Sequence, residues 1–425
     1  MPPFSTMTDS STAARSSYRR IVLHSPFGLM WIGQALSGSG DMIFDIAVLW
    51  IVWVGSHNPV YIGLVQFLAL IPSVAVGPLV GPIVDRNSKR SVMITTALTQ
   101  GAIVGTLVPQ LALGRFPPFW EMGFVVLALG AFGRIYSLAF FAAVPEVLSG
   151  PDLVRANALS SISGEVNSAA SYSLAGLLIL FLGASVPVSY DALTFVVCAT
   201  AIWAIKPWKY IHRDQGKSSI WDSSGLRAIV SQRLITELVI IGSVTALLGN
   251  AVSVGIVVRI LGATSSPGFL GGFFAAYSVG AATGSYLLGL FATSLRPGPS
   301  IAMGIAGSGA AVIGVAFSPN AYSILGFALL LGATVAVVDI PMSSLFQSEI
   351  PQGRVASVVG TAGVFWSVTG PVGAVFGGIL FATGSASLDF AVLGALFVLF
   401  GGLTRSWKEV RRSSLNRGEA SSPSL

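Results

Sequence analysis

Two aspartates, Asp41 and Asp45, lie four residues apart within a long apolar stretch of the chain. If that stretch is helical, the two carboxyl groups project from nearly the same side, one turn apart. Carboxyl groups this close in a poorly polar surrounding bind and release protons as a coupled pair. The pair therefore has the chemistry of a site that carries a proton. The alternative is a structural role, in hydrogen bonds to a neighbouring helix.

Three more ionisable residues lie inside apolar stretches. Arg134 lies well inside the fourth predicted span. Glu165 and Asp339 are each a relay, a contact for a substrate cation or a static bond between helices. A charge at the centre of a membrane helix costs ~2.5 kcal/mol or more, so each such residue is a functional candidate. The predicted proton-coupling or substrate-cation site is Asp41, Asp45, Arg134, Glu165 and Asp339.

The elements that carry these residues follow from composition. Of 425 residues, 53% are hydrophobic and 9% are charged, against roughly 25% charged in a soluble domain. A membrane-spanning helix needs ~20 apolar residues, and the apolar stretches number twelve. We predict an all-α membrane protein with twelve transmembrane helices in two pseudo-symmetric six-helix bundles. The predicted spans are 27–54, 60–84, 92–113, 118–143, 156–184, 186–206, 234–258, 268–292, 299–318, 320–346, 354–383 and 386–404.

Polar segments divide the chain. We predict a disordered cytoplasmic tail at 1–26, an N-terminal bundle at 27–206, a cytoplasmic linker at 207–233, a C-terminal bundle at 234–404 and a cytoplasmic tail at 405–425. The tails, the linker and alternate loops hold 20 of the 23 Lys and Arg residues, which predicts that both termini are cytoplasmic in the inner membrane. Cationic loops that face an anionic leaflet explain the net charge of +6 without nucleic acid.

Composition also argues against an enzyme. The single cysteine, Cys198, lies in an apolar stretch, and His24, His57 and His212 lie in polar segments or at the ends of spans. We therefore expect no metal site, since no histidine pair or thiolate cluster is available at depth. Diagnostic catalytic and phosphate-binding motifs do not occur in a suitable setting, so we expect no cofactor. Any transport against a concentration gradient must then be driven by an ion gradient.

A charged loop follows the second predicted span. Its sequence, Gly81-Pro-Ile-Val-Asp85-Arg86-Asn-Ser-Lys89-Arg90, has a weaker echo after the eighth span, at 289–296. Such repeated halves are typical of secondary transporters, whose substrate site lies between the halves. Gly81 lets two helices approach closely, and the charges can form ion pairs in one state and release them in another. We interpret Gly81, Asp85, Arg86, Lys89 and Arg90 as a conformational latch; a merely topogenic basic loop is the alternative.

At these residues the sequence resembles the major facilitator superfamily. The loop fits its signature G-x-x-x-D-R-x-x-[RK]-[RK], and other segments resemble the bacterial drug and macrolide efflux branch. Those segments are Trp31-Ile-Gly33-Gln34, Ser39-Gly40-Asp41, Val144-Pro145-Glu146 and Asp191-Ala-Leu-Thr-Phe195. The resemblance implies two bundles that rock about a central cavity and export an amphipathic solute against protons. It also implies that the first and fourth helices face this cavity, so that Arg134 either holds one carboxylate of the aspartate pair ionised or forms a permanent ion pair with it. The family's Gly-Pro in the fifth span is replaced here by a stretch from Ser171 to Gly176.

We therefore expect a secondary active transporter that works by alternating access, with proton-coupled export of hydrophobic or cationic small molecules. Its expected partners are a small-molecule substrate, protons and the lipid bilayer, and we expect a monomer. Aromatic faces can bind a flat or cationic solute; the candidates are Phe44, Tyr136, Phe140, Tyr172 and Phe365. Two alternatives stay open: a carrier of this fold for a specific metabolite, siderophore or metal ion, and a non-transporting membrane sensor.

Overall fold

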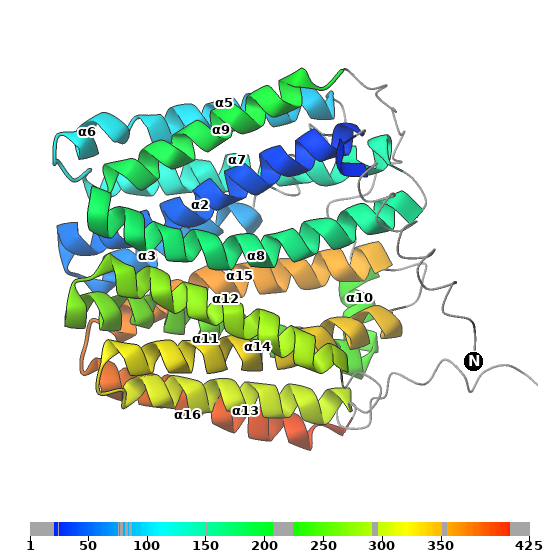
Figure 1. Ribbon diagram of the computed structural model, residues 1–425. Coiled ribbons are helices and arrows are strands. Elements are labelled where there is room, and N and C mark those ends of the chain that lie inside the picture. The colour runs from blue at the N-terminus through cyan, green and yellow to red at the C-terminus, as the bar shows by residue number, and fades with distance from the viewer. Residues whose placement is uncertain are drawn as a thin grey trace, which may run out of the picture.

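The computed structural model describes residues 21–23, 25–74, 76, 80, 84, 87–148, 151–206, 224–290, 296–350 and 355–408. All the regular elements in these ranges are helices, and the long ones run side by side in Figure 1. Ten are long and apolar enough to cross a membrane, and two shorter apolar helices cover 59–74 and 166–182. These helices match the twelve predicted spans, and the all-α architecture is confirmed.

The first bundle contains six of the spans. Its helices are α2 (Pro26–Ser56), α3 (Pro59–Leu70), α5 (Lys89–Gly105) followed by α6 (Val108–Ala112), α7 (Phe119–Val147), α8 (Pro151–Leu182) and α9 (Ser185–Ala204). Pro26 and Pro59 are the first residues of α2 and α3. At this position a backbone N–H has no acceptor within the helix, so proline loses no hydrogen bond there. Turns between helices use left-handed residues, His57 (φ 49°) and Gly183 (φ 81°).

The second bundle repeats this arrangement. Its helices are α11 (Arg233–Thr264), α12 (Pro267–Leu290), α13 (Pro297–Ala316), α14 (Ala321–Glu349), α15 (Val355–Leu380) and α16 (Ala386–Ser406). Each main contact has a counterpart in the first bundle: α11 packs on α15 and α16 as α2 packs on α8 and α9, and α13 packs on α14 and α16 as α5 packs on α7 and α9. The pairing supports the predicted pseudo-symmetry.

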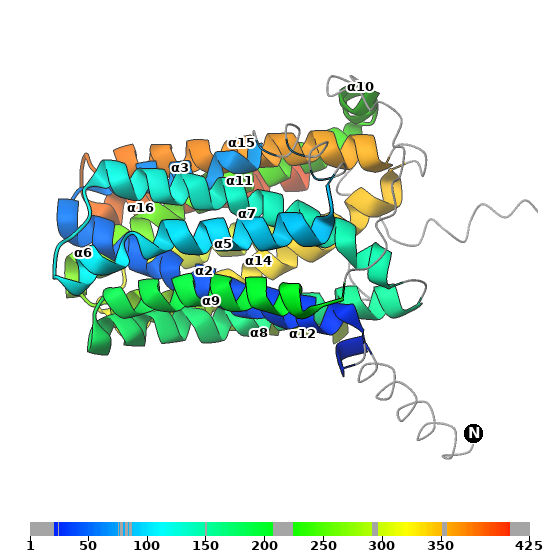
Figure 2. The ribbon, with the colours of Figure 1, turned by 90° about the horizontal axis from the view of Figure 1, so that it is seen from above.

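One sequence-based prediction needs correction. The third span was predicted as one helix over 92–113, but α5 ends at Gly105 and α6 starts at Val108. Pro109 explains the break, because it lacks the N–H that would bond to the carbonyl group of Gly105. Within the predicted linker, α10 (Ser224–Ser231) forms and packs against α15. Figure 2 shows α10 at the side of the bundles, next to the end of α15.

Close backbone contacts between the two bundles lie toward one end of the helices. We call the end where α2 starts and α16 ends the terminal end, and the opposite one the distal end (Figure 1). A Cβ atom at Gly63 of α3 would lie 2.5 Å from the carbonyl oxygen of Ala374 of α15. A Cβ atom at Gly176 of α8 would lie 2.8 Å from that of Pro267 of α12. Both contacts lie toward the distal end, so glycines allow the backbones of the two bundles to meet there.

Candidate functional site

A cavity of about 620 Å³ lies inside the helix assembly, mostly within the second bundle. Its wall comes from α11 to α16, and the first bundle contributes Ser168 and Tyr172 of α8. The volume is within the range of pockets that hold small organic molecules. Most lining side chains are apolar or aromatic. The polar ones besides the α8 pair include Thr245, Asn250, Ser253, Tyr277, Ser278, Ser308 and Asp339.

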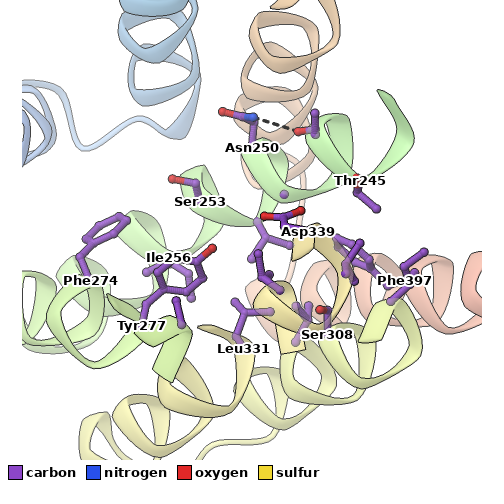
Figure 3. Close-up of a pocket in the computed structure, with 18 of the residues that line it drawn as sticks. Thr245, Asn250, Ser253, Ile256, Phe274, Tyr277, Ser308, Leu331, Asp339 and Phe397 are labelled. Atoms are coloured by element: carbon purple, nitrogen blue, oxygen red, sulfur yellow. Dashed lines mark hydrogen bonds between the residues drawn. The ribbon is translucent and has the colours of Figure 1, made fainter. Parts of the chain in front are cut away.

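Asp339 of α14 is the only acidic residue that lines the cavity in the part of the chain that the structure describes. In Figure 3 its carboxyl group lies among the other lining side chains, between Ser253 and Ser308. The side chain is exposed and has no ion pair or hydrogen bond among the described residues. No Lys, Arg or His lines this cavity. The carboxyl group is therefore available to a molecule that enters.

Aromatic side chains form part of the cavity wall. The rings of Tyr172 and Phe274 have their centroids 5.3 Å apart, which brings α8 of one bundle against α12 of the other. Trp366 of α15 has its centroid 5.3 Å from that of Phe346, and its Nε1 donates to the carbonyl oxygen of Val239. The N–H of Trp366 is thereby engaged with the backbone of α11. These rings provide faces suited to a flat or cationic solute.

The predicted aspartate pair lies in the first bundle, near this cavity. Asp41 is partly buried and Asp45 is exposed, and the two carboxyl groups interact electrostatically. Asp45 also interacts with the hydroxyl group of Tyr172, which in turn interacts with that of Tyr277. Because both tyrosines line the cavity, the aspartate pair lies beside it without being part of its lining.

A third carboxyl group, which the sequence analysis did not identify as a candidate, joins this pair. Asp191 of α9 is fully buried (0% exposed), and neither carboxyl oxygen has a hydrogen-bond partner. It interacts electrostatically with both Asp41 and Asp45. The signal in the sequence was its place in a segment that carries the family resemblance. We call Asp41, Asp45 and Asp191 the carboxyl cluster.

The remaining charged candidates are not joined to the cluster. Arg134 is exposed on α7, and within the described ranges it forms no ion pair with Asp41 or Asp45. The predicted contact is therefore not present in this conformation. Glu165 belongs to α8, but its side chain lies outside the described residues.

A second pocket, of about 440 Å³, lies between α2, α7 and α8. Phe140 and Trp31 line it, and the Nε1 of Trp31 donates to the hydroxyl oxygen of Ser163. Tyr136 stacks on Phe140 at 6.5 Å between centroids and lies 3.2 Å from the sulfur of Cys198. No acidic side chain lines this pocket in the part of the chain that the structure describes.

The predicted cavity aromatics therefore differ in position. Tyr172 lines the large cavity and Phe140 lines the smaller pocket. Phe44 and Tyr136 are buried in the packing between helices, and Phe365 is 43% exposed on α15. Those three do not line either of the two pockets. Length of an apolar stretch predicts a span, but it does not tell which side of the helix faces a cavity.

Two of the five residues of the predicted latch can be described. Gly81, Asp85 and Arg86 lie outside the described residues. Lys89 is buried, and its Nζ donates to the carbonyl oxygen of Val84 at 2.7 Å. Arg90 donates to the carbonyl oxygens of Ile202 and Trp203, in the last turn of α9. The last carbonyls of a helix lack the usual i+4 donor, and that of Ile202 also accepts from the N–H of Ile205. Arg90 adds side-chain donors to these carbonyls, so it caps α9 and holds it to the start of α5.

The described residues contain no group of three or more His, Cys, Asp or Glu side chains arranged to hold a metal ion. The carboxyl cluster is therefore a group of acids without the geometry of a metal site. Cys198 is buried.

Comparison with known proteins agrees with this architecture. The sequence profile of the transmembrane secretion effector family matches residues 20–352. The chain is 23% identical over 409 residues to the MFS-type transporter YfiS of Bacillus subtilis, covering 91% of this chain and 94% of YfiS. It is 22% identical over 180 residues to YvqJ of the same species (42% of each chain) and 22% identical over 181 residues to macrolide efflux protein A of Streptococcus pyogenes (42% and 44%). These two matches span less than half of either relative.

Solved structures share the fold at low identity. The nucleoside transporter NupG aligns with a TM-score of 0.68 and 14% identity, covering 92% of this chain and 100% of that one. A bacterial homologue of the lysosomal transporter Spinster, inward-facing and occupied, aligns at 0.70 and 12% (91% and 98%). A bacterial homologue of the iron transporter ferroportin, inward-facing, aligns at 0.66 and 16% (89% and 97%). Together with the profile match over most of its length, this places the multi-pass membrane chain in the transmembrane secretion effector family of major facilitator transporters.

Proposed function

We propose that the protein is a secondary active transporter that works by alternating access and exports hydrophobic or cationic small molecules in exchange for protons. The observation that carries the proposal is the cavity of about 620 Å³, whose lining is mainly apolar and aromatic and whose only described charge is Asp339. Such a lining favours an amphipathic solute over a sugar or an anion, because few polar groups are available to replace the solute's hydration.

The charge of the substrate follows from the same cavity. A carboxylate without a basic neighbour attracts a cation, and the nearby rings of Tyr172, Phe274 and Trp366 can stabilise it further through their faces. Neutral hydrophobic solutes would use the aromatic wall alone. This supports a preference for cationic molecules without excluding neutral ones.

Proton coupling is assigned to Asp41 and Asp45. Their carboxyl groups lie close to each other and, through Tyr172, next to the cavity. A proton bound there therefore changes the charge beside the substrate without occupying the substrate's place. Because no basic side chain neutralises the pair among the described residues, proton binding is the available means of reducing the repulsion between the two carboxylates.

Alternating access is supported by the contacts between bundles. The close approaches at Gly63 and Gly176 lie toward the distal end, so the bundles are pressed together there. With both termini cytoplasmic, as the distribution of Lys and Arg predicts, the conformation described here is closed toward the outside. We infer that it is an inward-facing state, in which the cavity loads from the cytoplasm.

The test is transport by the purified protein in proteoliposomes. An imposed pH gradient should drive the accumulation of a lipophilic cation such as tetraphenylphosphonium, and addition of the cation should in turn evoke proton movement. Liposomes that contain the Asp41→Asn, Asp45→Asn double variant are the control for leak. Proton movement that is the same with and without substrate would contradict the proposal.

A second candidate is a carrier for a specific solute. Structural neighbours include a nucleoside transporter and a homologue of an iron transporter, although at such identities they show only the fold. Asn250, Ser253 and Asp339 would suffice to hydrogen-bond a nucleoside in this cavity. Competition by nucleosides, but not by lipophilic cations, in the same liposomes would favour this candidate; Fe²⁺ or Mn²⁺ binding abolished by Asp41→Asn would favour a metal carrier.

A further inference from the structure

Asp191 is buried in a way that is unusual for an acid. It lies in α9, one turn and a half from the helix start, with 0% of its surface exposed and with both carboxyl oxygens lacking a hydrogen-bond partner. An ionised carboxylate in this position would be very costly, because nothing replaces its lost hydration. Native structures leave few buried polar groups unsatisfied, and those that remain call for an explanation.

The surrounding helices hold Asp191 against the aspartate pair. Asp191, Thr194 and Cys198 recur at a helical spacing and so lie on one face of α9. That face meets two glycines of α2: a Cβ atom at Gly40 would lie 2.5 Å from Oδ1 of Asp191, and one at Gly33 would lie 3.4 Å from the sulfur of Cys198. The glycine next to Asp41 therefore brings the backbone of α2 directly onto the Asp191 carboxyl group.

The hydrogen bonds formed by neighbouring residues do not involve the carboxyl group of Asp191. The hydroxyl groups of Ser39 on α2 and Tyr190 on α9 are hydrogen-bonded at 2.9 Å, which ties the two helices together beside Asp191. Thr194 donates to the backbone carbonyl oxygen of Asp191 and not to its carboxyl group. The polar groups around Asp191 thus fix the helices and do not neutralise the acid.

Among the described residues, no cation forms an ion pair with Asp191. α7, whose Tyr136 contacts Cys198 of α9, carries Arg134, which is exposed and has no ion pair with Asp191. α2 carries Asp41 and Asp45 and no basic residue, and α6 has no charged residue. On α5, Lys89 and Arg90 donate to backbone carbonyls near the terminal end. On α8, Arg155 is paired with Asp152 at 2.9 Å; the Glu165 side chain lies outside the described residues.

We propose that Asp191 is the innermost proton-binding residue of the coupling site: it carries a proton in this conformation and passes it to Asp41 or Asp45 after that residue has lost its own. In this step an O–H bond breaks at Asp191 and forms at the receiving carboxylate, and the negative charge moves to Asp191 until a proton from the other side of the membrane neutralises it. The inference rests on the proposed proton exchange and adds a third carrier to it.

The experiment compares Asp191→Asn with the wild-type protein in proteoliposomes under an imposed gradient of about one pH unit. Loss of one coupled proton should lower the maximal accumulation of tetraphenylphosphonium about tenfold, the factor that corresponds to one pH unit. The matched control is Asp389→Asn on α16, which removes another buried acid with an unpartnered oxygen, but in the other bundle. We expect its accumulation ratio to equal that of the wild type.

A second measurement detects the proton on Asp191 directly. Infrared difference spectra of the Asp41→Asn, Asp45→Asn double variant, recorded with and without tetraphenylphosphonium, should retain a carboxylic-acid C=O band, which Asp191→Asn added to the double variant should remove. An unchanged accumulation ratio in Asp191→Asn, or no such band in the double variant, would overturn the assignment of Asp191. Absence of proton coupling in the wild type would instead overturn the proposed function, so the two failures are distinguishable.

Discussion

In the first bundle Asp41, Asp45 and Asp191 crowd together where α2 meets α9, whereas in the second bundle Asp339 is the only described acid in a cavity of about 620 Å³. Three carboxyl groups without a cation repel one another and suit a group that exchanges protons. One carboxyl group with space and aromatic rings around it suits a larger cation. The contrast lies in the surroundings, because the chemical group is the same.

The backbone does not cause this contrast. α2 and α11 occupy equivalent places in the two bundles, since each packs on the fifth and sixth helices of its own half. Midway along, α2 carries Asp41 and Asp45, whereas α11 carries Asn250 and Ser253, which line the cavity. A repeated fold thus supplies two similar frames, and side-chain differences give one frame to proton chemistry and the other to solute binding.

The largest effect on transport is expected when a charge is removed from the carboxyl cluster. In Asp41→Asn or Asp45→Asn we expect gradient-driven accumulation to be abolished while downhill exchange of substrate continues, because the cavity is untouched and only the proton carrier is lost. Uphill uptake and counterflow in the same liposomes measure the two activities. Unchanged accumulation in both variants would remove proton coupling from the first bundle.

Removing the charge from the cavity should instead change the affinity for a cationic substrate. In Asp339→Asn we expect the affinity for a lipophilic cation to fall roughly ten- to a hundredfold, because the Coulomb attraction of a carboxylate for a nearby cation, about 1–4 kcal/mol in a partly hydrated site, is lost, while neutral substrates bind as before. Binding of tetraphenylphosphonium and of a neutral competitor to the purified protein measures this. Ser253→Ala, a lining change that removes no charge, is the control.

Equal loss of affinity for cationic and neutral ligands in Asp339→Asn would mean that the carboxyl group supports the cavity's shape. Loss of proton coupling with unchanged affinity would move Asp339 to the same role as the carboxyl cluster. Either result would contradict the proposal that the first bundle exchanges protons and the second binds the solute.

The fold could be predicted from the sequence to a large extent, because the bilayer demands ~20 apolar residues per span and positions of polar breaks fix the number of helices. The acids at Asp41, Asp45 and Asp339 could be identified for a related reason: charge inside an apolar stretch is costly. What could not be predicted was which acids come together. Asp191 stands near the start of its span, where a charge costs less, and only the packing of Gly40 reveals its burial.

The cavity lining was also beyond sequence analysis. Helices in lipid are apolar on all sides, so periodicity does not distinguish the lipid-facing surface from the cavity. Tyr172 was among the candidates and lines the cavity, whereas Phe44 packs between helices and is buried. Trp366 and Tyr277 carried no special pattern and became visible only through their neighbours. Contacts between distant segments hold this information.

The interface between the bundles offers a milder perturbation. In Gly176→Ala the added methyl group would lie 2.8 Å from the carbonyl oxygen of Pro267. Overpacking of this kind costs about 1–3 kcal/mol, so we expect the population with an open distal end to rise roughly tenfold. Spin labels on Leu113→Cys and Leu388→Cys, in a Cys198→Ala background, report the separation of the bundles at that end.

Gly164→Ala is the control for this comparison, since it lies in the same helix and has no neighbouring heavy atom within 4 Å of the added methyl group. Identical distance distributions for Gly164→Ala and Gly176→Ala would show that the glycine contact does not set the conformational equilibrium. A shift in Gly176→Ala alone would link the first bundle's position to the distal contact, and so sharpen the distinction between residues that bind and residues that move.

The smallest effect is expected at the latch, of which the described residue Arg90 binds the end of α9 opposite to Asp191. Arg90→Ala removes the donors that cap the last carbonyls of α9, and Arg86→Ala removes a neighbouring charge of the same loop. Both should slow turnover a few-fold, with little change in KM, because substrate contacts are unaffected while the bundles exchange conformations less readily.

Arg115→Ala, which replaces an exposed arginine beyond the distal end of α6, is the control. Initial rates over a range of substrate concentrations separate the two parameters. A rise in KM at constant maximal rate would place the loop in substrate binding. That result would contradict the proposal that the latch acts on the conformational change and not on the substrate.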